Sequence, residues 1–172
     1  MKKSFTLIEL LMVLSIMGIL SLMAFFGIKS SQSNISVLRS GFSLVSEIRK
    51  AQEWALGQKD TKKRYGIYAQ TGNPTGNQGE IILFVDENED GRYQPPEKRE
   101  DFINGLKRLE KGVFVKSINP TSPLNIVFEA PQPKVYFNGR IFPSEVEIVL
   151  SNGSFDVKVK INRAGLIWVQ TK

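Results

Sequence analysis

A single carboxylate, Glu9, lies near the start of an almost uninterrupted apolar run, residues 5–28. The run is long enough to cross a bilayer as a helix, which needs about 20 residues. A carboxylate at the centre of a bilayer costs at least ~2.5 kcal/mol, so an acid in such a segment indicates a functional site. A cation placed beside it there would attract it strongly, because the dielectric is low. The alternative is a lone acid that reaches out to the lipid–water interface.

A second group of oxygen ligands lies in the acidic segment 86–91 and just after it. The segment matches the pattern of the twelve-residue calcium loop, in which acids and amides alternate before a glycine and a final glutamate follows. Calcium binds six to eight such oxygens, and the predicted ligands are the side chains of Asp86, Asn88, Asp90 and Glu97 and the carbonyl of Arg92. A strand is predicted before this loop and two prolines follow it, unlike an EF-hand. The alternative is a solvated loop closed by Asx turns.

Basic residues form the third group of candidate functional residues. The chain carries 23 Lys and Arg against 17 Asp and Glu, which gives a net charge of +6. Lys158 and Lys160 share one face of a predicted strand, and Arg163 follows in the next turn. Phosphate contacts by these three residues would give salt-sensitive DNA binding without sequence preference. The alternative is an ordinary solvated strand face.

The residues needed for common catalytic sites are missing. The chain has no cysteine and no histidine. This excludes disulfides, Ser-His and Cys-His catalysis, and metal binding by histidine. The sequence also lacks the nucleophile-elbow, P-loop and zinc-protease motifs. We therefore expect a protein that is not an enzyme.

The elements that position these groups begin with one long helix, predicted over residues 6–56, with a break near Gly27 as the alternative. Its first half is apolar on all sides. Its second half has an apolar stripe at three- and four-residue spacing, which includes Ile35, Leu38, Phe42, Val45 and Ile48. Such a helix buries one face, so Phe42 and Val45 are predicted to lie in the core.

After the helix, the apolar pattern changes to short runs and to a period of two, with turn residues between them. The predicted strands are residues 64–70, 80–85, 113–118, 125–129, 134–137, 145–150, 155–161 and 166–170. A long helix followed by many short strands predicts the α+β class, with antiparallel sheet packed on the helix.

Residues 2–10, KKSFTLIEL, resemble the class III signal of type IV pilins and type II secretion pseudopilins. The resemblance implies a pilin fold, cleavage after Ser4 by a prepilin peptidase, N-methylation of Phe5 and a role of Glu9 in filament assembly. The residue before the cleavage point is usually glycine in that family and is serine here.

The same resemblance implies a domain organisation. Residues 1–4 would be a cleaved leader, 5–28 a transmembrane and filament-core helix, 29–58 an amphipathic helix packed on sheet, and 59–172 a β-rich domain. Lys2 and Lys3 would lie on the cytoplasmic side. The protein would then span the bacterial inner membrane once, with its C-terminal domain in the periplasm, before it enters a filament. The implied partners are the prepilin peptidase and methyltransferase, the inner membrane and other pilin or pseudopilin subunits.

Within this class, the layout is similar to the GspH/FimT family of minor pilins and pseudopilins. The similar segments are the helix end at 49–56, the strand and acidic loop at 83–91, and the late hairpin at 157–169. Phe26 stands where major pilins usually have proline, which favours a minor component. The alternatives are a major pilin subunit and a competence minor pilin that binds DNA through Lys158, Lys160 and Arg163.

Overall fold

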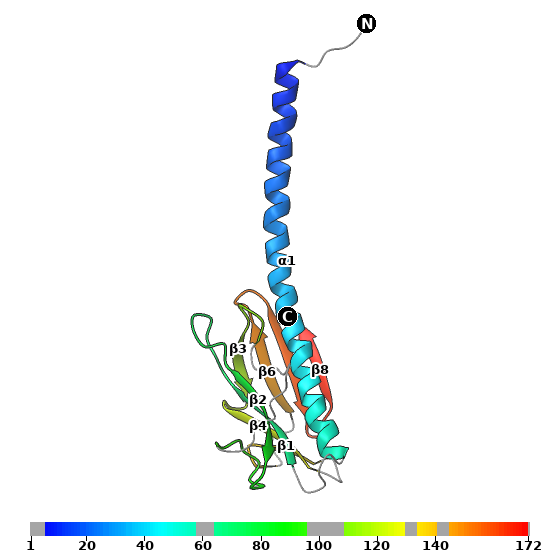
Figure 1. Ribbon diagram of the computed structural model, residues 1–172, viewed down its shortest axis with the longest axis vertical. Helices are drawn as coiled ribbons and strands as arrows, with labels where there is room; N and C mark the ends of the chain where they lie inside the picture. Colours follow the sequence, from blue (N-terminus) through cyan, green and yellow to red (C-terminus); the bar gives the residue numbers. More distant parts are fainter. Residues whose placement is uncertain (1–5, 58–63, 96–108, 130–133, 141–144, 172) are drawn as a thin grey trace.

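The computed structural model describes residues 6–57, 64–95, 109–129, 134–140 and 145–171, with backbone alone for residues 24–31. One helix, α1 (Leu7–Leu56), rises out of a β domain and continues far beyond it (Figure 1). The helix has the predicted extent and continues through Gly27 without the break that the sequence left open. It ends at Gly57, whose amide donates to the carbonyl of Glu53.

Within the described residues, eight strands form two antiparallel four-stranded sheets. The first sheet has the order β2-β1-β4-β5, with β1 (Arg64–Gln70), β2 (Glu80–Asp86), β4 (Leu124–Glu129) and β5 (Lys134–Phe137). The second has the order β3-β6-β7-β8, with β3 (Phe114–Asn119), β6 (Glu145–Ser151), β7 (Asp156–Asn162) and β8 (Ile167–Thr171). Each strand lies within one residue of its predicted bounds. The α+β class is confirmed, and the division into two sheets is an addition to the prediction.

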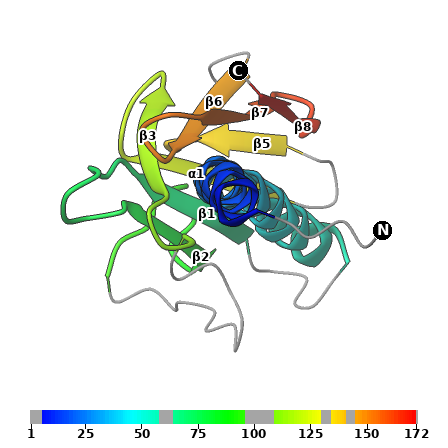
Figure 2. The same ribbon diagram turned by 90° about the horizontal axis from the view of Figure 1, so that it is seen from above.

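The C-terminal half of α1 packs against both sheets, so that seen from above the helix lies between them (Figure 2). Its buried face includes Leu44, Ile48 and Ala51, each fully buried in the main hydrophobic core. Gly41 lies so close to β7 that a Cβ placed on it would be 2.8 Å from Cγ1 of Val157. The absence of a side chain there allows the helix to approach the sheet.

The buried face differs in part from the predicted stripe. Val45 and Ile48 are buried as expected, but Phe42 is 60% exposed. Glu47, which is not part of the predicted stripe, is 7% exposed and forms an ion pair with Lys50 at 2.9 Å. Two sheets contact the helix from two directions, so the buried arc is wider than one stripe and is turned away from Phe42.

Candidate functional site

Glu9 lies in the first turn of α1 and takes part in a capping box. The Thr6 hydroxyl accepts a hydrogen bond from the Glu9 amide at 3.4 Å, and the Glu9 carboxylate accepts from the Thr6 amide at 2.9 Å and hydroxyl at 2.8 Å. Both bonds to the carboxylate end on Oε2, which leaves Oε1 without a hydrogen bond among the described residues. The pattern Thr-x-x-Glu is a sequence signature of this cap, and it could have identified Thr6 as the partner of Glu9.

The apolar part of α1 that follows Glu9 is exposed to its surroundings. The side chains of Leu7, Leu14 and Met23 are 77%, 57% and 69% exposed, and the apolar residues between them are similar. A contiguous apolar surface of this kind is unusual on a water-soluble monomer and indicates a lipid or protein interaction surface. Ser4 and Phe5, the predicted cleavage and methylation residues, lie outside the described residues.

The acidic segment begins with the last residue of β2 and continues into the turn that follows it. Asp86, its first residue, is only 1% exposed, and its Oδ2 accepts from the Gly91 amide at 3.0 Å. Its Oδ1 is buried and has no hydrogen-bond partner among the described residues. Burial raises the pKa of the Asp86 carboxyl, and the Gly91 bond opposes this shift.

Two other predicted calcium ligands accept hydrogen bonds from backbone amides of the same turn. Oδ1 of Asn88 accepts from the Asp90 amide at 3.1 Å, and Oδ1 of Asp90 accepts from the Arg92 amide at 2.8 Å. These are Asx turns, the alternative that the sequence left open. Among the described residues, no three acidic side chains come together in a way that could hold a metal ion. Glu97 lies outside the described residues, so the calcium site stays a prediction.

The basic face on β7 is paired with acids on β6. Nζ of Lys158 lies 3.1 Å from Oε1 of Glu147, and Nζ of Lys160 lies 2.9 Å from Oε1 of Glu145. The hydrogen bond to Glu145 raises the pKa of Lys160. Arg163 is exposed in the turn between β7 and β8. Paired lysines offer less charge to phosphates, so DNA binding stays a prediction without further support.

Comparison with known proteins locates the recognisable part of the chain at its N-terminus. Residues 1–25 match the family described as the prokaryotic N-terminal methylation motif. No curated protein and no solved structure matches the chain. Among the helices formed by described residues, none combines the length and hydropathy that a bilayer crossing needs.

The matched segment ends within α1, so the motif and the β domain are joined by one helix. The motif implies processing by a prepilin peptidase, anchoring in the inner membrane before assembly, and assembly with pilin subunits. It also supports the expectation of a structural protein rather than an enzyme. The chain therefore carries the N-terminal methylation motif of the type IV pilin and pseudopilin class on a pilin-like α+β fold.

Proposed function

We propose that the protein is a minor pilin or pseudopilin of the GspH/FimT kind, which assembles into a type IV pilus or a type II secretion pseudopilus. Cleavage after Ser4 would expose Phe5 for methylation, and residues 5–28 would hold the subunit in the inner membrane before assembly. The observation that carries the proposal is α1 itself. It begins inside the methylation motif with exposed apolar side chains and ends as a helix packed on two sheets.

Glu9 is proposed to pair with the N-terminal ammonium of a neighbouring subunit in the filament. Oε2 already accepts two bonds from Thr6, which hold the carboxylate at the helix N-terminus. Oε1 accepts none among the described residues and could receive the ammonium group. In an apolar filament core the pair would be stabilised by the low dielectric, and one such pair per subunit would set the register.

Two substitutions of Glu9 separate the charge from the cap. Glu9→Gln keeps a capping-box residue but removes the charge, whereas Glu9→Ala removes both. Removing one partner of a buried ion pair costs about 3–5 kcal/mol. Incorporation of either variant into sheared filaments should therefore fall by about a hundredfold or more. Membrane insertion and cleavage after Ser4 should continue.

Glu87→Ala is the matched control, because Glu87 is an exposed acid in the turn after β2 of the β domain. This variant should enter filaments as the wild type does. Normal incorporation of Glu9→Gln together with failure of Glu9→Ala would assign Glu9 to helix capping alone. Normal incorporation of both variants would refute any assembly role.

A further inference from the structure

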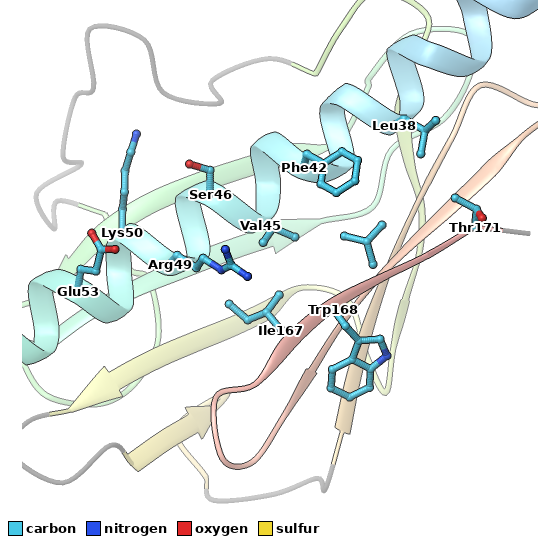
Figure 3. A pocket seen from close by; sticks show the side chains of 11 residues that line it. Leu38, Phe42, Val45, Ser46, Arg49, Lys50, Glu53, Ile167, Trp168 and Thr171 are labelled. Carbon is cyan, nitrogen blue, oxygen red and sulfur yellow. The ribbon is translucent and has the colours of Figure 1, made fainter.

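A groove of about 660 Å³ runs between α1 and β8 (Figure 3). Its apolar walls come from Leu38, Phe42 and Val45 on the helix and from Ile167 and Val169 on the strand. Phe42 is 60% exposed although it lies beside residues of the main core. The second sheet ends at β8, so no further described strand covers this side chain.

Among the residues that the structure describes, none forms a bulge in β8 or a loop over its outer edge, the usual protections of an edge strand. Within the described residues β8 pairs with β7 alone, in continuous register from Val157↔Thr171 to Ile161↔Ile167. Its sequence, IWVQT, has no charge and no proline. Half of the backbone groups of an edge strand point away from its neighbour, and an unprotected edge is a template for another strand.

Two other edges of the sheets are protected. β3 has a register shift between Val115 and Ser117, and the backbone of Val115 is bonded to Gln78 and Gly72 of a neighbouring loop. β5 has four residues and begins with Lys134. Bulges, covering loops, short length and lysine are the usual protections of an edge. Within the described part of the chain β8 has no bulge, covering loop or lysine, which distinguishes it from β3 and β5.

We propose that an extended segment of a neighbouring pilin-class subunit adds to β8 as a fifth strand of the second sheet and covers Phe42. The backbone of β8 would supply hydrogen bonds, and the groove would receive alternate side chains of the added strand. This inference rests on the proposed function, because it takes its partner from the filament.

We infer that the partner is a subunit because the groove and the exposed apolar segment of α1 belong to the same helix. Its helical wall belongs to α1, the same uninterrupted helix whose segment from Leu7 to Met23 is apolar and exposed. The methylation motif implies that this helix assembles with pilin subunits. Assembly through α1 would bring neighbouring chains alongside the groove, where a strand from one of them can reach β8.

Hydrogen exchange measures the addition directly. The full chain would be compared in detergent micelles and in filaments recovered from cells, with mass spectrometry of the peptide over residues 166–171. The outward amides of β8 should exchange at least about tenfold more slowly in filaments, because bonding to an added strand protects them. Equal exchange in the two states overturns the inference while leaving the proposed function intact. Absence of the chain from filaments overturns both.

A matched pair of variants tests the groove. Phe42→Ala removes the side chain that the added strand would cover, and it should return β8 exchange in filaments towards the rate in micelles. Leu56→Ala is the control, since Leu56 is 49% exposed on the same helix and outside the groove. It should keep the protection. Protection that survives Phe42→Ala contradicts a strand seated in this groove.

Discussion

At the scale of single residues, the surroundings of each acid determine what it can do. Glu9 is exposed and capped by Thr6, so one of its oxygens can accept a further donor. Asp86 is buried, and one of its oxygens has no described partner. Glu147 on β6 forms an ion pair with Lys158 on the neighbouring strand β7 and reduces the charge of the basic face. The same group, a carboxylate, is therefore available to a further donor in Glu9, stabilises a turn in Asp86 and neutralises a lysine in Glu147.

Asp86 predicts a pH dependence of folding. Burial raises its pKa in the folded state, so folding takes up a proton and the folded state loses stability as pH rises from the ordinary towards the raised pKa. Asp86→Asn removes this loss. The free energy of unfolding of the variant, relative to wild type, should therefore increase with pH from about 4 upward. Urea unfolding at several pH values measures it, and a difference that does not change with pH would contradict burial as the dominant effect.

Substitution of Asp90 tests whether the acidic segment is a hydrogen-bonded turn or a calcium site. Its carboxylate accepts from the Arg92 amide and from the Gln94 side chain. Because a typical intramolecular bond contributes about 0.5–1.5 kcal/mol, Asp90→Ala should lower the free energy of unfolding by about 1 kcal/mol. For a turn, this decrease should be the same with EGTA and with millimolar calcium in thermal unfolding. A decrease confined to calcium would instead establish the predicted metal site.

At the scale of elements, the two halves of α1 depend on different partners. The first half exposes apolar side chains, and the second packs on β1, β4, β6, β7 and β8. Most stability of a helix in a protein comes from packing of its apolar face. The packed half should therefore decide the stability of the β domain.

Leu44 and Phe42 test which face of α1 is buried. Leu44 is 0% exposed and Phe42 is 60% exposed. Leu44→Ala should reduce the free energy of unfolding by about 2–5 kcal/mol, because it leaves a cavity in the core. Phe42→Ala should change it by less than about 1 kcal/mol. Urea unfolding of the detergent-solubilised chain measures both. A larger loss for Phe42→Ala than for Leu44→Ala would mean that the predicted stripe, rather than the observed face, is buried.

The sequence predicted the elements well because their signals are local. The alternation of apolar residues and the turn residues located each strand within one residue. The exposure of Phe42 and the burial of Glu47 depend on where two sheets meet the helix. Strand pairing across long separations, such as β1 with β4, determines that arrangement. No local sequence pattern predicts this arrangement of the sheets around the helix.

The candidate sites were predictable to different degrees. The methylation motif and Glu9 stand in one short segment, and the Thr6 cap could have been read from the same residues. The pairing of Lys158 with Glu147 could be predicted only from the register of β6 and β7. That register places Lys160 directly opposite Glu147, and Lys158, two residues earlier on the same face, contacts Glu147 diagonally. A basic strand face therefore looked free in the sequence and is paired in the structure.

At the scale of the whole molecule, one uninterrupted helix links the N-terminal motif to the β domain (Figure 1). Its exposed apolar half extends away from the two sheets and can pack in a lipid or protein environment. The β domain then lies outside that environment and can contact neighbouring subunits through surfaces such as the groove beside β8. This division matches a subunit that moves from a membrane into a filament.

The most direct test of this account is mass spectrometry of the N-terminus of the protein recovered from bacterial membranes. The account predicts a mature chain that begins at Phe5, carries one methyl group on its amino nitrogen and lacks residues 1–4. Inactivation of the prepilin peptidase should leave Met1 to Ser4 in place. A chain that keeps residues 1–4 in cells with an active peptidase, or that is cleaved at another position, would contradict the assignment to the pilin and pseudopilin class.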